Sequence, residues 1–249
     1  SQRIAKALRE QGVEISTGYR VKSVSRSNES FIAELAGSDE KTLNVSHVLV
    51  TTRMPYFEGL GLDRLGMRVT RDQGIWVDDR LRTSVNGIFA VGDVTGGWMM
   101  SHVASSMAVI AAENAMGNDR KFPFHLIPRA IWSIPEVGSV GISEEEAEAK
   151  GLNVEVGTFP YAINGLAMLR DEMNGSVKIV SDTDYGEILG VHIVGANATE
   201  LVGEAVMAMQ LEGTVKELAE SMRCHPTFSE SVVDAARDVL NWALYLPRS

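Results

Sequence analysis

Residues 223–230 read Arg-Cys-His-Pro-Thr-Phe-Ser-Glu, which places a histidine just before a proline and a glutamate shortly after it. Proline has a fixed φ angle and restricts the residue before it, so His225 is expected to be extended and outside any helix. Thr227 and Glu230 have the spacing of a helix N-cap and its reciprocal glutamate. Apolar residues then recur at helical spacing over 232–243. The stretch therefore predicts a rigid turn that holds His225 beside the first turn of a helix carrying Glu230.

An imidazole next to a carboxylate can act as a general base, because the carboxylate fixes the tautomer of the ring and stabilises the imidazolium. His225 and Glu230 are therefore candidate catalytic residues. On local spacing alone, a capping box beside an incidental histidine is the more common arrangement.

The string His-Pro-Thr-x-Ser-Glu near a C-terminus resembles the signature of the flavin disulfide reductases, the class I pyridine nucleotide-disulfide oxidoreductases, and dihydrolipoamide dehydrogenase in particular. The resemblance implies that His225 is the acid/base that works on a substrate thiol and that Glu230 orients it. Lipoamide dehydrogenases usually read His-x-His-Pro, whereas Arg223 stands in place of the first histidine here. This departure bears on the subfamily and not on the chemistry.

A second motif lies at 83–93, which reads Thr-Ser-Val-Asn-Gly-Ile-Phe-Ala-Val-Gly-Asp. We expect a strand at 88–91, ending at Gly92, where a ligand can approach the backbone closely. Gly-Asp alone is an ordinary turn. The whole string, however, resembles the second flavin motif of the same reductases, which implies that Gly92 and Asp93 bind FAD through its ribityl chain.

A helix is predicted from about residue 101 to residue 116, with Gly117 as its stop. In the family, the corresponding segment puts a helix N-terminus under the flavin ring, where the helix dipole favours negative charge on the reduced flavin. The resemblance therefore adds cofactor-binding residues at the start of this helix, namely Met100, Ser101, His102 and Ala104.

The first fifty residues predict a helix ending at Gly12, a short strand at 13–15, a three-stranded meander and an apolar strand at 47–51 of the kind found inside a parallel sheet. The meander strands are expected at 19–26, 31–35 and 41–45. This series resembles the second half of an NAD-binding domain. The Gly-x-Gly-x-x-Gly turn of the first half does not occur in the sequence.

Two residues correspond to family contacts with NAD. Val21 lies in the meander, where an ordinary strand residue is the simpler interpretation. Thr52 takes the place of the glycine in the family's Gly-Arg-x-Pro-Asn segment, and its side chain stands where close backbone approach is expected.

The pattern becomes α+β after a polar stretch at 118–123. Domain boundaries follow: 1–52 as the second half of an NAD-binding domain, 53–118 as the C-terminal segment of an FAD-binding domain, and 119–249 as an interface domain. The fold class is therefore α/β and α+β, with a partial Rossmann-like segment before a dimerisation domain. The interface domain is predicted to have strands at 129–132, 137–141, 154–159, 177–181 and 188–194, and helices at 144–150, 199–211, 215–222 and after residue 227. Ser143 and Glu146 have the spacing of a capping box for the first of these helices.

Composition limits the function further. The chain of 249 residues has a formal net charge of −10, which argues against a nucleic-acid or anionic-membrane surface. A single cysteine, Cys224, supplies neither an internal disulfide nor a Cys-x-x-Cys metal site, and we interpret it as a structural thiol. No signal peptide or membrane span is recognised, so a cytoplasmic location is expected, without bound metal.

The sequence thus resembles the C-terminal part of a dihydrolipoamide dehydrogenase-like flavoenzyme, without the family's N-terminal flavin loop and Cys-x4-Cys redox pair. The implied reaction is oxidation of a dithiol to a disulfide, with electrons passing through FAD to NAD. Implied partners are a second copy of the chain and, through a lipoyl substrate, components of a 2-oxo acid dehydrogenase complex. Two alternatives stay open: another flavin disulfide reductase such as a glutathione reductase, and a catalytically silent dimerisation module.

Overall fold

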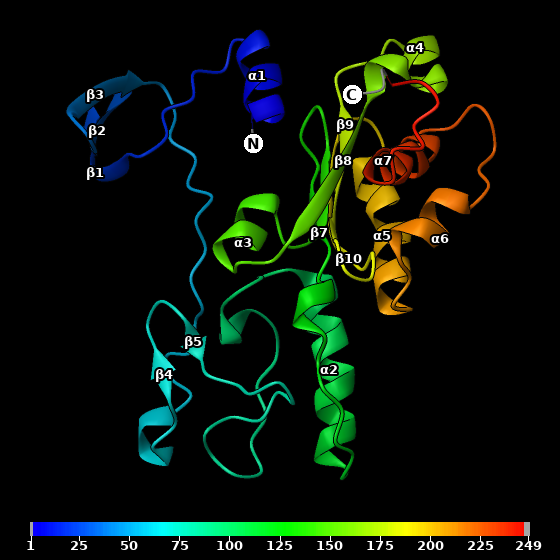
Figure 1. The fold of residues 1–249 in the computed structure, drawn as a ribbon. Coiled ribbons are helices and arrows are strands. Elements are labelled where there is room, and N and C mark those ends of the chain that lie inside the picture. Colours follow the sequence, from blue (N-terminus) through cyan, green and yellow to red (C-terminus); the bar gives the residue numbers. More distant parts are fainter. Residues whose placement is uncertain (1, 247–249) are drawn as a thin grey trace. The chain divides into compact units, whose positions relative to one another are not determined.

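The computed structural model describes residues 2–246, which divide into two compact units (Figure 1). The C-terminal unit comprises Ser1–Val13 and Pro123–Ser249, and the central unit comprises Glu14–Phe122. Each unit has its own hydrophobic core, so each is described by itself.

The C-terminal unit is built on a five-stranded antiparallel sheet with the strand order β6-β7-β10-β9-β8. The five predicted strands are confirmed to within one residue at each end. Their bounds are Arg129–Ile131 (β6), Val137–Gly141 (β7), Val154–Pro160 (β8), Ser176–Asp182 (β9) and Ile188–Val194 (β10).

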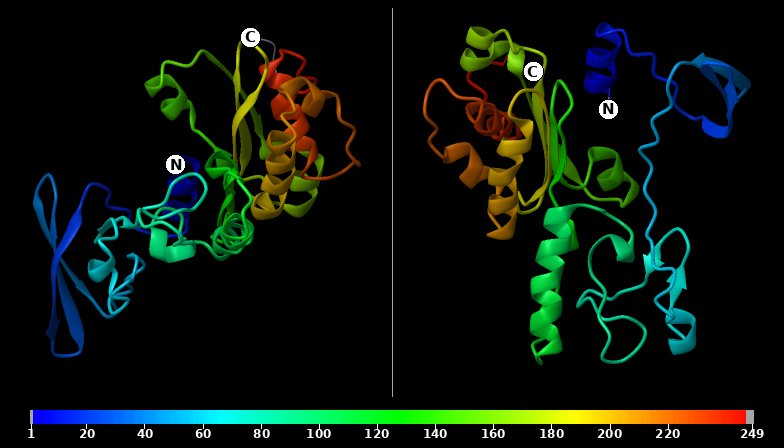
Figure 2. Two further views of the ribbon diagram at one scale, coloured as in Figure 1. Left: turned by 90° about the horizontal axis from the view of Figure 1, so that it is seen from below. Right: turned by 180° about the vertical axis from the view of Figure 1, so that it is seen from behind.

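One face of this sheet is apolar and is covered by two helices. Strand register aligns Gly157, Ile179, Val191 and Val140 in one row, and directly paired residues point to the same face. Helix α7 (Glu230–Val239) packs against this row at Gly157. The neighbouring row on the same face contains glycine at 138, against which α5 (Ala198–Gln210) packs. Figure 2 shows both helices on one side of the sheet.

The opposite face is polar, with Ser139, His192, Lys178 and Thr158 in one row. The Nε2 atom of His192 lies 2.9 Å from the carbonyl oxygen of residue 142, and burial lowers the pKa of this imidazole. Lys178 Nζ lies 2.6 Å from the carboxylate of Glu144, the first residue of α3 (Glu144–Ala149). The capping box predicted for α3 is confirmed.

Further short elements complete the C-terminal unit. Helices α1 (Gln2–Glu10) and α6 (Val215–Glu220) confirm predictions, whereas α4 (Gly165–Arg170) was not predicted. The side chain of Gln11, just after α1, donates a 2.7 Å hydrogen bond to the carbonyl of Ile134. Two 3₁₀ helices are η3 (Phe124–Leu126) and η4 (Tyr161–Ile163).

The central unit begins with the predicted meander, which is confirmed as β1 (Arg20–Ser27), β2 (Ser30–Ala36) and β3 (Glu40–Val45). A small core around Met67, Ile75 and Ala90 follows. Helix α2 (Ser101–Ala115) confirms the helix predicted from about residue 101 to residue 116. The remaining elements are η1 (Leu62–Leu65), β4 (Val69–Thr70), β5 (Gly74–Ile75) and η2 (Gly92–Thr95).

Three predicted strands are wrong. Residues 13–15 and 47–51 have no regular structure, and the segment 88–91 makes only a single β-bridge, between Phe89 and Arg82. The apolar run at 47–51 is a strand pattern that needs neighbouring strands on both sides, and the described residues place none beside it. Leu49 is consequently 87% exposed.

Within residues 2–246, no helix combines the length and hydrophobicity needed to cross a bilayer.

Close approach of α7 to the sheet at Gly157 gives a stability prediction. A Cβ atom there would overlap the carbonyl oxygen of Ala235 and lie 2.6 Å from Val239 Cγ2. We expect Gly157→Ala to lower the free energy of unfolding by about 2 kcal/mol or more, as overpacking does. Urea denaturation measures the change.

Gly203 in α5 is the matched control, because an added Cβ there meets nothing within 4 Å. Gly203→Ala should raise the free energy of unfolding by about 0.5–1 kcal/mol through helix propensity. Equal effects of the two substitutions would contradict the packing described for α7.

Candidate functional site

The structure brings His225 and Glu230 together at the start of α7. His225 Nδ1 lies 2.9 Å from Glu230 Oε1, and the backbone N–H of Thr227 donates to Glu230 Oε2 at 2.7 Å. A carboxylate can only accept hydrogen bonds, so Nδ1 carries the proton and Nε2 of the neutral ring is left as the base. This is the geometry required of an oriented general base.

The local structure around this pair differs from the predicted capping box. Helix α7 begins at Glu230 with Ser229 as its N-cap, so the prediction of Thr227 as the N-cap is wrong. The hydroxyl of Thr227 donates instead to the carbonyl of Cys224 at 2.8 Å. The glutamate half of the box forms, through the bond from the N–H of Thr227 to Glu230, whereas the threonine hydroxyl bonds within the loop to Cys224 and Ser229. His225 lies outside any helix, as predicted.

Asn164 supports this loop and was not identified from the sequence. Its side chain is buried, and its Nδ2 atom donates to the carbonyl of Thr227 and to the hydroxyl of Ser231, each at 2.9 Å. Its Oδ1 atom accepts from the backbone N–H of Ala167 at 3.0 Å and so caps α4. Asn-Gly before a short apolar run is an N-cap signal from which α4 could have been predicted. The local sequence does not reveal the contacts of Asn164 with residues 227 and 231.

The side chains of His225 and Glu230 are buried to very different extents. The side chain of His225 is 77% exposed, whereas that of Glu230 is only 26% exposed. Phe228 lies between these two residues in the sequence, and its side chain is buried. Its ring centroid lies 5.2 Å from that of Tyr161. The loop is thus fixed by its apolar and acidic side chains while the imidazole faces outward.

The expected flavin residues gather where η2 meets α2 in the central unit. Gly92 is buried with φ 72°, and a Cβ atom there would lie 3.0 Å from Cβ of Ala104. Asp93 follows on the surface. Met100 is the N-cap of α2 and makes no side-chain capping bond. Ser101 and His102 are exposed in the first turn.

The expected NAD residues are placed on separate elements. Val21 lies in β1, paired with Leu35 next to a register shift, and is 58% exposed. Thr52 is exposed in the irregular segment after β3.

Within the part of the chain that the structure describes, no three His, Cys, Asp or Glu side chains are grouped closely enough to hold a metal ion. Cys224 is exposed as a free thiol.

Both units match family models. Residues 1–108 match the model described as pyridine nucleotide-disulphide oxidoreductase, and residues 127–236 match the dimerisation domain of the same proteins. The turn at Gly92 and the start of α2 lie within the first matched range, and His225 and Glu230 lie within the second. The chain belongs to the pyridine nucleotide-disulphide oxidoreductase family.

Individual relatives are similar to this chain over nearly its whole length. A dihydrolipoyl dehydrogenase of Corynebacterium glutamicum is 39% identical over 96% of this chain and 53% of its own length, and one of Zymomonas mobilis is 37% identical over 97% and 53%. The crystal structure of LpdA from Mycobacterium tuberculosis superposes with a TM-score of 0.84 at 29% identity, over 94% of this chain and 51% of that one. The chain spans about half the length of the curated relatives it matches.

The hydrogen bonds of Asn164 predict how replacing this residue changes the stability of the protein. Asn164→Ala leaves the buried hydroxyl of Ser231 without this donor and removes the cap of α4. We expect a decrease of about 2–3 kcal/mol in the free energy of unfolding, measured by urea denaturation.

Exposed Asn174 is the control for that experiment. Asn174→Ala should change the free energy of unfolding by less than about 0.5 kcal/mol. A similarly small change for Asn164→Ala would show that the buried amide does not hold the loop.

Proposed function

We propose that the chain is the C-terminal portion of an FAD-dependent, dihydrolipoyl dehydrogenase-like enzyme that oxidises a dithiol to a disulfide and passes the electrons to NAD. The observation that carries this proposal is the 2.9 Å bond between His225 Nδ1 and Glu230 Oε1. Support comes from the relatives called dihydrolipoyl dehydrogenase. The same proposal keeps the domain division at 1–52, 53–118 and 119–249.

His225 performs the proton transfer in this proposal. Its Nε2 atom takes the proton from the substrate thiol, leaving a thiolate, which is the nucleophile in exchange with a disulfide. Glu230 accepts from Nδ1 throughout and stabilises the imidazolium while it carries the proton. The N–H of Thr227 holds the second carboxylate oxygen, so the carboxylate cannot rotate away from the ring.

The central unit has residues that fit FAD. Gly92 leaves no room for a side chain next to Ala104, and Asp93 offers an exposed carboxylate for hydroxyl groups. FAD, when bound, supplies the redox chemistry by accepting the electron pair released in disulfide formation. Met100, Ser101, His102 and Ala104 are proposed to lie against it, and Val21 and Thr52 against NAD.

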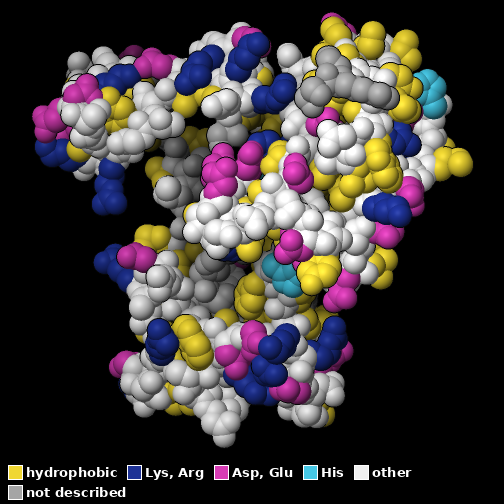
Figure 3. Space-filling view, viewed as in Figure 1, with side chains coloured by type: hydrophobic (Ala, Val, Ile, Leu, Met, Phe, Trp, Pro, Cys, Tyr) yellow, Lys and Arg dark blue, Asp and Glu magenta, His cyan; other side chains and the backbone are white. Residues whose placement is uncertain are grey.

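The C-terminal unit is proposed to form a homodimer. Residues 127–236 match a dimerisation domain, and the exposed imidazole of His225 needs a second surface to exclude water from the reacting thiol. Hydrophobic side chains lie at the surface over α4 (Figure 3), where Leu169 is 76% exposed and Met168 is 57% exposed. We further propose a cytoplasmic location and a lipoyl group of a 2-oxo acid dehydrogenase complex as the substrate.

A second candidate function has one observation in its favour. The only cysteine of the chain is Cys224, so these 249 residues cannot supply a redox pair of cysteines by themselves. As an isolated fragment, the chain would then act as a dimerisation module without turnover. Another dithiol or disulfide substrate, such as glutathione, is the alternative within the same chemistry.

Removal of the proposed base tests the catalytic role. In the complete protein that contains this chain, His225→Gln should lower dithiol turnover by about 10²–10⁴-fold, because general-base catalysis is lost. Steady-state kinetics with dihydrolipoamide measures the change. His125→Gln replaces an exposed histidine of η3 and should leave turnover unchanged. Near-normal turnover of His225→Gln would exclude the assigned role.

Light scattering, combined with an assay of dithiol turnover, tests the proposed homodimer and the alternative of a dimerisation module without activity. The chain has a mass of 27.1 kDa, and the purified chain is expected to scatter as a species of twice that mass without dithiol turnover. A monomer at about 50 μM would contradict dimerisation through the C-terminal unit, since obligate interfaces of this kind persist well below that concentration.

A further inference from the structure

The loop that carries His225 is held in place by different kinds of contact before and after that residue. Residues 221–229, between the end of α6 at Glu220 and the start of α7 at Glu230, have no regular structure. After His225, the loop is held by the bonds of Thr227 and by buried Phe228. Before His225, apolar burial cannot hold it, because Met222 is 94% exposed.

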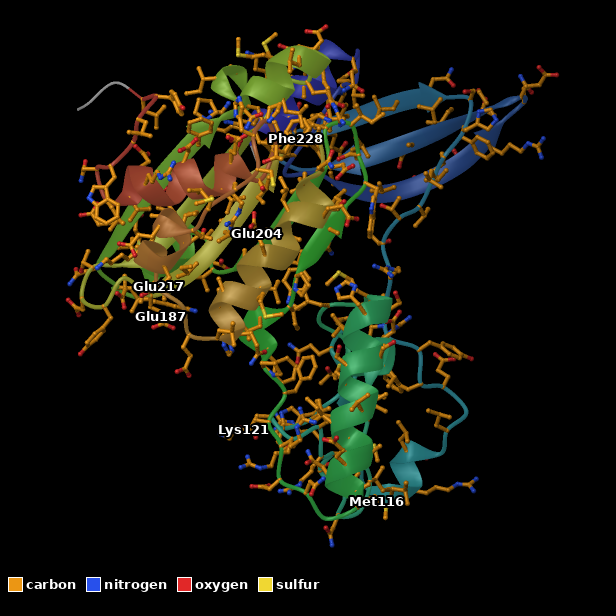
Figure 4. All side chains as sticks on the ribbon, turned by 90° about the vertical axis from the view of Figure 1, so that its right-hand side faces the viewer. Met116, Lys121, Glu187, Glu204, Glu217 and Phe228 are labelled. Carbon is orange, nitrogen blue, oxygen red and sulfur yellow. The ribbon has the colours of Figure 1, made fainter. Side chains whose placement is uncertain are left out.

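Arg223 supplies polar contacts on that first side. Its Nε and Nη2 atoms donate to Glu204 Oε2 at 3.1 and 2.7 Å. Its Nη1 atom donates to the hydroxyl of Ser221 at 2.8 Å and to the carbonyl of Met222 at 3.1 Å. Ser221 in turn donates to the carbonyl of Leu218 in α6 at 2.6 Å. One guanidinium therefore connects the loop to α5 and, through Ser221, to α6; Figure 4 labels Glu204 on α5.

Glu204 shows that this contact is more than a surface ion pair. The side chains of Arg223 and Glu204 are only 20% and 25% exposed, and Glu204 Oε1 is buried without a hydrogen-bond partner. Burial raises the pKa of Glu204, and the charge of Arg223 opposes that shift. A carboxylate in this position depends on the guanidinium for its charge, so breaking the pair leaves an uncompensated buried group.

From these contacts, we propose that Arg223 is a positioning residue: by connecting the loop to Glu204 on α5, it holds the imidazole of His225 in hydrogen-bonding register with Glu230. The effect on turnover rests on the proposed function, whereas the effect on the imidazole does not. Arg223 acts through the backbone of residues 221–225. Lysine cannot replace it, because an ammonium group lacks the planar fork that reaches Glu204 and the loop together.

Nitrogen-15 NMR of the histidine rings in the whole chain tests the proposal directly. In the native chain, neutral His225 should be mainly the Nδ1–H tautomer, because Glu230 accepts from Nδ1. Arg223→Lys should lower the ratio of Nδ1–H to Nε2–H by about fivefold, as expected for the loss of one hydrogen bond. His225→Gln identifies the signal.

Arg237→Lys is the matched control. Arg237 also holds a carboxylate, Asp234 Oδ1 at 3.0 Å, and a backbone carbonyl, that of Ala219 at 3.2 Å, but it makes neither bond to residues 221–229. We expect it to lower the melting temperature about as much as Arg223→Lys while leaving the His225 tautomer ratio unchanged. If Arg223→Lys does not fold, the tautomer ratio is measured in Glu204→Gln instead, and a decrease in the ratio of Nδ1–H to Nε2–H is again expected.

Two outcomes would overturn the proposal: an unchanged tautomer ratio in a folded Arg223→Lys or Glu204→Gln variant, or an equal change in Arg237→Lys. In the complete protein, Arg223→Lys should lower kcat for the dithiol by about 10-fold without changing KM for NAD. If His225→Gln retains full turnover, the proposed function fails, while the tautomer measurement still decides whether Arg223 positions the ring.

Discussion

The carboxylate of Glu230 is the constraint on which the site depends. One of its oxygens accepts from the imidazole of His225, and the other accepts from the backbone N–H of Thr227. It lies in the first turn of α7, where the helix dipole favours a negative charge. A single side chain therefore starts the helix, closes the loop and fixes the tautomer of the ring. A neutral replacement would weaken all three roles at once.

The rest of the C-terminal unit keeps that carboxylate in place. Helix α7 can approach the sheet because position 157 is a glycine, and its buried residues form part of the core shared with β8 and β9. Asn164 connects the start of α4 to the loop on one side of Glu230 and to Ser231 on the other. Packing and hydrogen bonding thus converge on an imidazole that remains at the surface.

Local patterns predicted the elements whose stabilising contacts lie within the element itself or in an adjacent strand. The capping box of α3 and the alternating strands β7 and β10 are of this kind. The run at 47–51 was mispredicted because its pattern presupposes neighbouring strands that the described residues do not place beside it. Arg223 shows the same limit: the sequence marks it as a departure from His-x-His-Pro, but its partner, Glu204, is 19 residues away on another helix. The pairing of His225 with Glu230 was predictable because both are in one turn.

Glu230 is proposed to orient His225 for proton transfer with a thiol. The most direct test is rapid mixing of the complete protein carrying Glu230→Gln, with flavin absorbance followed separately for reduction by dihydrolipoamide and by NADH. Reduction by the dithiol is expected to slow by about 10–100-fold while reduction by NADH is unchanged, because only the first needs the oriented imidazole. Equal rates with the dithiol in the variant and the native protein would contradict it.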